Sequence, residues 1–216
     1  MRKGLILGLV FAAVMTFAGA VFAENAPLLS FVCPKLEAPI KIDGILDDAG
    51  WVTASAFGGK TVVDLGNNVD MISVLPRVAF YGYDAKNLYV AFVVVSDKAL
   101  VTDATDWWMD DECEVFLAPD DSGYAQLGIN TIGTLNYGRA DWDFSLITVK
   151  ASKIGVANYI ELAIPFGMMG MKTPKTGDKM KIAFCGHQTD PDIWVAANAV
   201  YGGFHNPEIF STMTFL

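Results

Sequence analysis

The stretch that decides the fold is residues 112–117, ECEVFL, in which polar and apolar side chains alternate until Phe116. Successive side chains of an extended strand point to opposite faces of the sheet. The apolar set that faces the core is Cys113, Val115 and Leu117. The outer set is Glu112, Glu114 and Phe116. The stretch therefore predicts a strand with a buried inner face and two acidic residues on its outer face.

Two further stretches repeat this pattern and extend the outer face. In AQLGIN, residues 125–130, Leu127 and Ile129 face the core, while Gln126, Gly128 and Asn130 face outward. In KIAFCGHQT, residues 181–189, His187 lies in the set Cys185, His187 and Thr189. If these strands are neighbours, the outer face is a polar platform of Glu114, Gln126, Asn130 and His187. Such a platform could hydrogen-bond a neutral polar ligand.

Short runs rich in β-branched and aromatic residues recur along the chain, separated by Gly, Asn and Asp turns. The predicted strands are 39–42, 77–83, 88–95, 112–117, 125–130, 145–152, 159–164, 180–189 and 212–216. Single helical turns are predicted at 47–54 and 165–170. Many short strands in one domain indicate an all-β fold, an antiparallel β-sandwich of the immunoglobulin or jelly-roll kind.

The first 23 residues have the pattern of a secretory signal peptide. Arg2 and Lys3 precede an apolar run that ends at Val21-Phe22-Ala23, which predicts cleavage after Ala23. The run is also about long enough to span a bilayer, so an uncleaved anchor is the alternative. We expect a signal peptide at 1–23, one domain at 24–216, no membrane insertion after cleavage, and secretion to the periplasm or the cell exterior.

Charge and cysteine content narrow the function. The net charge of −9 would repel phosphate, so nucleic acid and anionic membranes are poor partners, whereas calcium would be attracted. The three cysteines, Cys33, Cys113 and Cys185, are too few for a disulfide framework, and buried thiols are expected.

Motifs for catalysis are scarce, and no Walker loop, GxSxG, CxxC, GxGxxG or HExxH spacing occurs. Asp111 and Glu114 could in principle form the acid and base of a glycosidase. Asp110 and Asp111 could instead ligate calcium, position a loop or be solvated. The prediction is a protein that is not an enzyme.

Six segments resemble the family 9 carbohydrate-binding modules of the DOMON-like superfamily, in family order. They are IKIDGILDDAGW (40–51), YDAKNLYVAF (83–92), WMDDECEVFLAPDD (108–121), AQLGIN (125–130), YIELAIPF (159–166) and FHNPEIFSTMTF (204–215). The resemblance implies a β-sandwich, often with structural calcium, that binds mono-, oligo- or polysaccharides. The first segment has the structural role of a turn followed by the packing of Trp51.

The resemblance also implies site residues. Trp108 matches one of two aromatic rings that clamp a sugar, and Phe204 matches the other, where a tryptophan is usual. Glu114 matches a residue that hydrogen-bonds sugar hydroxyls. Gln126 and Asn130 flank Gly128, which stands where sugar-binding members carry an arginine, and His187 stands where they carry an amide. The predicted ligand-binding set is Trp108, Asp111, Glu114, Gln126, Asn130, His187 and Phe204.

Several alternatives accompany this interpretation. The Trp108 ring could cap the core instead of stacking on a sugar, and Glu114 could be a solvated sheet residue. Some DOMON-like relatives bind haem b, which gives a redox module as a second hypothesis. An adaptor domain that has the fold but no sugar site is a third, favoured by Gly128. A secreted sugar binder could also be a partner in a surface glycan-processing system.

Overall fold

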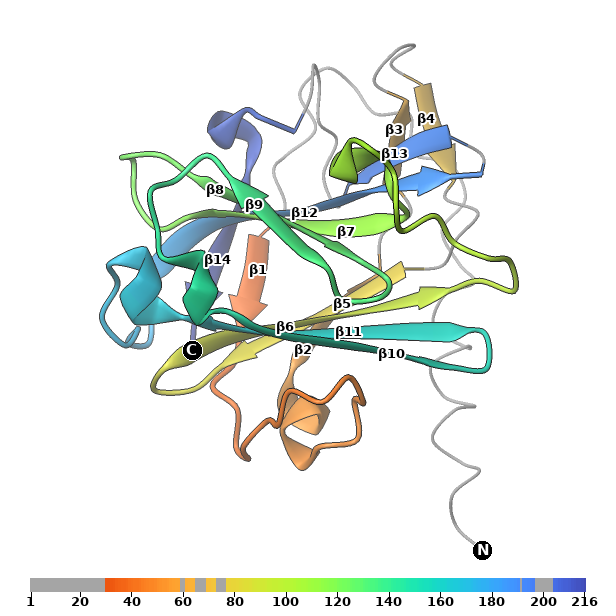
Figure 1. The fold of residues 1–216 in the computed structure, drawn as a ribbon. Coiled ribbons are helices and arrows are strands. Elements are labelled where there is room, and N and C mark those ends of the chain that lie inside the picture. Colours follow the sequence, from red (N-terminus) through yellow and green to blue (C-terminus); the bar gives the residue numbers. More distant parts are fainter. Residues whose placement is uncertain (1–29, 59–60, 65–68, 73–76, 191, 197–203) are drawn as a thin grey trace, which may run out of the picture.

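Two β-sheets lie face to face in the computed structural model of this protein, with the core between them (Figure 1). The structure describes residues 30–58, 61–64, 69–72, 77–190, 192–196 and 204–216. The predicted signal peptide, residues 1–23, lies outside these ranges. Within them, no helix is long and apolar enough to cross a membrane. The prediction of an all-β sandwich is confirmed.

The larger sheet has nine strands, and it carries the ECEVFL stretch near its middle. The order along its main path is β4-β3-β13-β12-β7-β8-β9, and β14 joins β12 to β1. The strands are β1 (Ser30–Cys33), β3 (Thr61–Asp64), β4 (Val69–Ile72), β7 (Glu112–Ala118), β8 (Ala125–Asn130), β9 (Leu135–Gly138), β12 (Lys179–Thr189), β13 (Asp192–Ala196) and β14 (Ser211–Phe215). The β1–β14 pair is parallel, and the other pairs of these named strands are antiparallel.

The smaller sheet has five strands in the order β10-β11-β6-β5-β2, all antiparallel. They are β2 (Ser55–Gly58), β5 (Arg77–Tyr83), β6 (Asn87–Val95), β10 (Thr148–Ile154) and β11 (Ala157–Pro165). Short 3-10 helices connect strands of the fold: η1 (Ala49–Thr53), η2 (Trp107–Met109), η3 (Phe144–Leu146), η4 (Phe166–Met169) and η5 (Pro207–Ile209).

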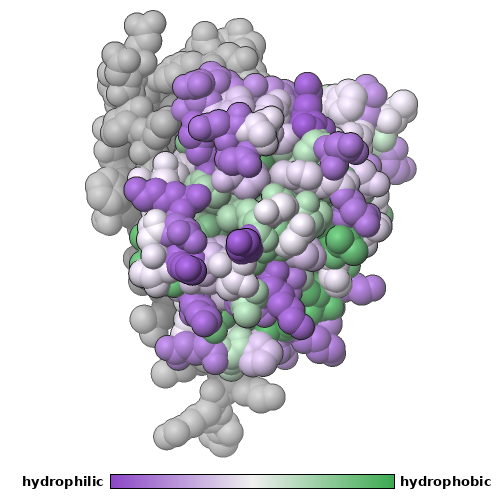
Figure 2. Space-filling view, turned by 90° about the vertical axis from the view of Figure 1, so that its left-hand side faces the viewer, coloured by the Kyte–Doolittle hydropathy of each residue, from purple (hydrophilic) through white to green (hydrophobic). Residues whose placement is uncertain are grey.

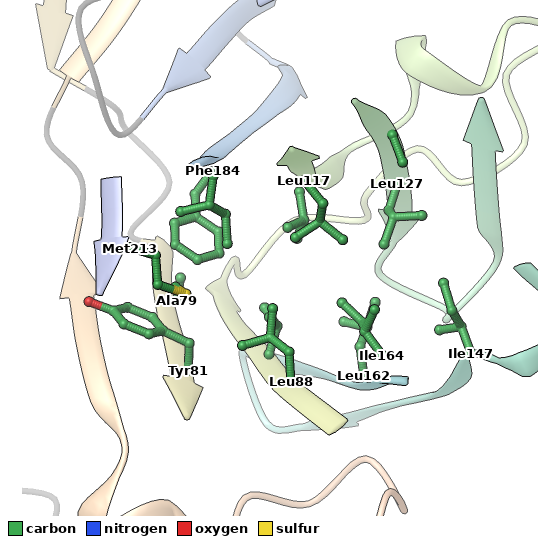
Figure 3. Packing of buried hydrophobic residues seen from close by; sticks show 14 of the residues in the cluster. Ala79, Tyr81, Leu88, Leu117, Leu127, Ile147, Leu162, Ile164, Phe184 and Met213 are labelled. Carbon is green, nitrogen blue, oxygen red and sulfur yellow. The ribbon is translucent and has the colours of Figure 1, made fainter. Parts of the chain in front are cut away.

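The core forms where the inner faces of the two sheets meet. Leu117, Leu127 and Phe184 come from the larger sheet and face Leu88, Leu162 and Ile164 of the smaller one (Figure 3). The alternation in ECEVFL and AQLGIN therefore assigns the inner faces correctly. Burial of each such side chain stabilises the fold by about 1.5–3 kcal/mol. All three cysteines are buried free thiols, as expected.

Residues 34–54 cover the outer face of the smaller sheet, seen below it in Figure 1. Glu161 of β11 anchors this segment, since its carboxylate accepts the Trp51 indole N–H at 2.8 Å and the Gly44 amide N–H at 2.6 Å. The Asp43 amide donates to the same carboxylate at 3.0 Å. The predicted role of this segment, a turn followed by the packing of Trp51, is confirmed.

Some predicted elements differ from the structure. Residues 39–42 form no strand, because Ile40 and Ile42 pack against the Trp51 cluster instead of pairing with another strand. The strand predicted from residue 145 begins at Thr148, because η3 occupies Phe144–Leu146 with Asp143 as its N-cap. Six short strands of the described ranges were not predicted: β1, β2, β3, β4, β9 and β13. All but β13 have four residues, which is the shortest length over which alternation can be recognised.

The outer surface of the sandwich is mixed in character. Figure 2 shows the side that lies on the left of Figure 1, where hydrophilic residues are interspersed with smaller hydrophobic areas. The large apolar side chains that reach solvent include Trp108, Tyr137 and Ile132. Single exposed apolar residues are common on folded proteins, so an exposed residue such as Trp108 must be judged by its neighbours.

Candidate functional site

The predicted platform lies on the outer face of three neighbouring strands, β12, β7 and β8. Glu112 of β7 pairs with His187 on one side and with Asn130 on the other. Glu114 pairs with Cys185 and with Gly128. Because paired residues of antiparallel strands point to the same face, the candidate residues of these strands share that face. The condition on which the platform depended, that these strands are neighbours, is met.

The platform is buried, which the alternation alone did not predict. Glu114 and His187 are both 0% exposed, and Gln126 and Asn130 are also buried. The alternative that Glu114 is a solvated sheet residue is therefore wrong. A strand shows which side of the sheet a residue faces, but not whether loops cover that side.

Two buried carboxyl groups, Glu112 and Glu114, form the centre of this face. Glu114 Oε1 accepts a hydrogen bond from Gln126 Nε2 at 2.6 Å. Among the described residues, neither the second oxygen of Glu114 nor either oxygen of Glu112 has a hydrogen-bond donor. Glu112 is 1% exposed, so its carboxyl group is shielded from bulk solvent.

Burial changes the acidity of both groups. It raises the pKa of Glu114 to about 7, against the opposing effect of the Gln126 hydrogen bond. Burial and the adjacent Glu114 charge raise the pKa of Glu112 well above its usual value, and Arg77 opposes this rise. The two carboxyls lie within hydrogen-bond reach of each other, so a single proton held by Glu112 can be shared with Glu114.

The two adjacent tryptophans of η2 have different places. The ring of Trp107 lies on Gly128: a Cβ added to this glycine would stand 2.7 Å from Trp107 Cε3 and 2.6 Å from Glu112 Oε2. Trp108 is 42% exposed and meets Trp107 edge-on, with ring centroids 5.7 Å apart. The alternative that Trp108 caps the core is wrong, because its ring lies at the surface.

The second predicted clamp residue, Phe204, is 4% exposed. Its ring packs against Phe116 and Trp194, at centroid distances of 6.2 and 5.6 Å. Phe204 therefore supports the face as a packing residue in this structure, and its stacking on a sugar stays a prediction.

Trp194 is an aromatic residue of this face that the sequence reasoning missed. It pairs with His187 and lies against its ring at 4.6 Å, partly exposed. In sheet order, the acid pair on β7 lies between Trp194 on β13 and Trp107 over β8. The alternation in DIWVA, residues 192–196, was the signal that could have placed Trp194 on a strand.

Asp111 holds the loop that carries the tryptophans. Its carboxylate accepts the amide N–H groups of Val101 and Thr189 at 2.8 and 2.9 Å, and the Thr189 hydroxyl at 2.8 Å. Asp110 accepts the Ala104 amide at 2.8 Å and the Asn130 side-chain amide at 3.0 Å. The structure thus gives both aspartates a positioning role, and direct contact between Asp111 and a ligand stays a prediction.

Asn130 and His187 belong to the same loop-holding network. The Asn130 side chain also donates to the Thr102 carbonyl at 3.2 Å and accepts the Thr134 amide at 2.9 Å. His187 Nδ1 lies 3.0 Å from the Asp110 carbonyl, and Nε2 lies 2.7 Å from Asp192 Oδ1. Their polar atoms bind protein groups here, so these residues fix the position of η2 relative to the sheet.

The candidate calcium ligands, Asp110 and Asp111, bind protein groups in the described ranges. No group of three or more His, Cys, Asp or Glu side chains there lies together in a way that could hold a metal ion. The Asp110 and Asp111 carboxylates, the candidates for calcium, accept protein N–H and O–H groups instead. Structural calcium stays a prediction.

Comparison with known proteins identifies the family. The model of the family described as "Carbohydrate family 9 binding domain-like" matches residues 42–215. The chain belongs to this family. No curated protein matches the sequence. The family assignment favours carbohydrate binding over the haem-binding alternative.

Solved structures show the same fold at low sequence identity. A family 9 module from Caldicellulosiruptor kristjanssonii in complex with cellotriose has a TM-score of 0.70 and 16% identity, covering 87% of this chain and 93% of its own. The module in complex with glucose has a TM-score of 0.67 and 16% identity, covering 86% and 95%. A putative carbohydrate-binding protein from Bacteroides uniformis has a TM-score of 0.69 and 14% identity, covering 88% and 100%.

Proposed function

We propose that this protein is a secreted, non-catalytic carbohydrate-binding protein whose site is the outer face of β13, β12, β7 and β8. The observation that carries the proposal is the exposed ring of Trp108 beside a face that holds Glu114 and Gln126. An indole offers an apolar stacking face for a sugar ring. The Glu114 carboxyl and the Gln126 amide, buried in this structure, match sugar hydroxyls once the Trp107 ring moves away from Gly128. Membership of the family 9 binding domains supports the same conclusion.

The ligand class is a mono-, oligo- or polysaccharide. The solved relatives in complex with glucose and cellotriose support testing these two sugars first. A secreted protein of this kind would act beside other proteins of a surface glycan-processing system, supplying binding where they supply catalysis.

Titration calorimetry with glucose, cellotriose and a broad sugar panel, with calcium present, tests the proposal. We expect binding by the wild type and at least about a tenfold loss in Trp108→Ala, since stacking contacts are central to such sites. Tyr137→Ala is the matched control, because Tyr137 is an exposed aromatic residue on the edge strand β9. Lack of binding to the whole panel would favour the adaptor alternative.

Export is tested separately by expressing the full chain and fractionating the cells. We expect the mature protein outside the cytoplasm, with Glu24 as its first residue. Retention of residues 1–23 in a membrane fraction would instead identify an uncleaved anchor.

A further inference from the structure

The Glu112–Glu114 pair has more hydrogen-bond acceptor oxygens than there are protein donors to them in the described ranges. Three of its four carboxyl oxygens have no protein donor in the described ranges, although both side chains are almost completely buried. Buried polar groups in folded proteins are normally hydrogen-bonded, and an orphaned carboxyl is costly. One shared proton satisfies part of this demand, but an acceptor-rich centre remains.

The positively charged group nearest to the Glu112–Glu114 pair, the Arg77 guanidinium, does not lie on the outer face with the two carboxyls. Arg77 of β5 lies against Gly186, 2.6 Å from where a Cβ would stand, and donates to the His187 carbonyl. Gly186 pairs with the core-facing Cys113, so this guanidinium lies on the opposite side of the sheet from the pair. Asp110 adds negative charge, and the Cys185 and Cys113 thiols are also neighbours of the pair. His187 pairs with Glu112 on the outer face, but its two ring nitrogens lie against the Asp110 carbonyl and Asp192 Oδ1. The outer face is therefore short of positive charge and of donors.

We propose that this acid pair recognises an amino sugar, with a protonated amino group donating to Glu112 and Glu114. An ammonium group carries three N–H donors and one positive charge, whereas a hydroxyl carries one donor and no charge. It therefore matches the three unpartnered oxygens better than any single sugar hydroxyl does. The inference rests on the proposed function and names the substrate class of that same face.

Entry of such a ligand requires movement of Trp107. Its ring is partly exposed and lies over Gly128, with Glu112 Oε2 against the same position. It belongs to the three-residue helix η2, whose N-cap residue Asp106 makes no side-chain capping bond. Rotation of this ring away from Gly128 opens the space beside Glu112 without disturbing a strand. The displaced indole then becomes available to cover the sugar ring.

Calorimetry at neutral pH with three sugars that differ at one position tests the inference. Glucosamine carries the amine, N-acetylglucosamine carries the same nitrogen without charge, and glucose carries a hydroxyl. We expect glucosamine to bind about tenfold or more tightly than the other two, in line with a charge-assisted contact. Glu112→Gln should remove this preference, so that glucosamine and glucose bind this variant within about twofold of each other. Glu37→Gln, at an exposed glutamate, is the matched control.

The outcomes separate the inference from the proposed function. Equal or tighter binding of glucose would overturn the amino-sugar assignment and leave carbohydrate binding intact. Failure of all sugars on the broad panel would overturn both. Tight binding of calcium alone, lost in Glu112→Gln, would also overturn the inference, because the pair would then be a metal site. The comparison among sugars uses the wild-type protein, so it tests the amino-sugar inference even if Glu112→Gln does not fold.

Discussion

The indole ring of Trp107 lies directly on Gly128, and each residue explains the other. Glycine is the only residue type at position 128 that leaves room for the ring, because any Cβ there would collide with Trp107 and with Glu112 Oε2. Gly128 pairs with Glu114, so the ring lies next to the acid pair. No long side chain fits at position 128, because the Trp107 indole occupies the space that such a side chain would need.

The first prediction concerns this contact. Gly128→Ala should lower the free energy of unfolding by about 1–3 kcal/mol, the usual cost of overpacking, or force Trp107 outward. Urea unfolding measures the first effect, and tryptophan fluorescence of the folded protein measures the second. Gly138→Ala is the control, because a Cβ there meets nothing within 4 Å.

A double variant makes the test specific. If the collision with Trp107 causes the loss, Trp107→Ala combined with Gly128→Ala should be more stable than the sum of the single effects implies. Additive effects would show that Trp107 does not press on Gly128 in solution.

The second prediction is that stability falls as pH rises through neutrality. Burial raises the pKa of Glu114 from 4.5 to about 7, and burial with the adjacent Glu114 raises that of Glu112. Between the unfolded and folded pKa values, the folded state binds more protons than the unfolded state, so the free energy of unfolding decreases with pH. The destabilisation is absent at a pH below the pKa of these glutamates in the unfolded state, and it is complete at a pH above their pKa in the folded state.

Urea unfolding across this pH window measures the effect. We expect a loss on the order of 2–3 kcal/mol between about pH 5 and about pH 8 for the wild type. Glu114→Gln should flatten the profile, whereas Glu37→Gln, at an exposed position, should keep it. A wild-type profile that rises with pH would mean that the pair is ionised and well partnered in the fold.

The strand faces could be predicted from the sequence because alternation is a local property, whereas the pairing of β12, β7 and β8 could not, because it joins segments far apart in the chain. Val115 and Leu117 face the core and Glu114 faces outward, as their period of two requires. The turn and packing of Trp51 were also predictable from their segment. The partner of that segment was not, because Glu161 lies 110 residues away from Trp51 along the chain.

Burial of the candidate site could not be predicted for a similar reason. Whether Glu114 is solvated depends on the covering loop, and that loop is held by long-range bonds such as Thr189 to Asp111. The sequence placed Glu112 on the correct face but gave no reason to select it. Which of Trp107 and Trp108 meets the sheet depends on the geometry of η2, a three-residue helix with no periodicity to read.

The third prediction concerns the loop that positions the tryptophans. Asp111→Asn replaces an acceptor-only carboxylate with an amide that can satisfy fewer of its three donors, on Val101 and Thr189. We expect a loss of about 1–3 kcal/mol and faster hydrogen exchange at the amides of Val101 and Thr189. Asp121→Asn, at an exposed aspartate, is the control. Unchanged exchange at both amides would show that the loop is held by other contacts.

The fourth prediction concerns the anchor on the opposite face. The Glu161 carboxylate accepts hydrogen bonds from the Trp51 indole N–H and from the amide N–H groups of Asp43 and Gly44. Glu161→Gln replaces one of its two acceptor oxygens with an NH2 group, which cannot accept a hydrogen bond from these donors. Charge-assisted bonds to a buried carboxylate are the stronger kind, so we expect destabilisation by about 2–4 kcal/mol in urea unfolding. Trp51→Phe removes only the indole donor and should destabilise the fold less than Glu161→Gln does.

Because this anchor lies on the outer face of the smaller sheet, sugar affinity of the folded fraction should be unchanged in both variants. A change in sugar affinity would mean that residues 34–54 contribute to the binding face.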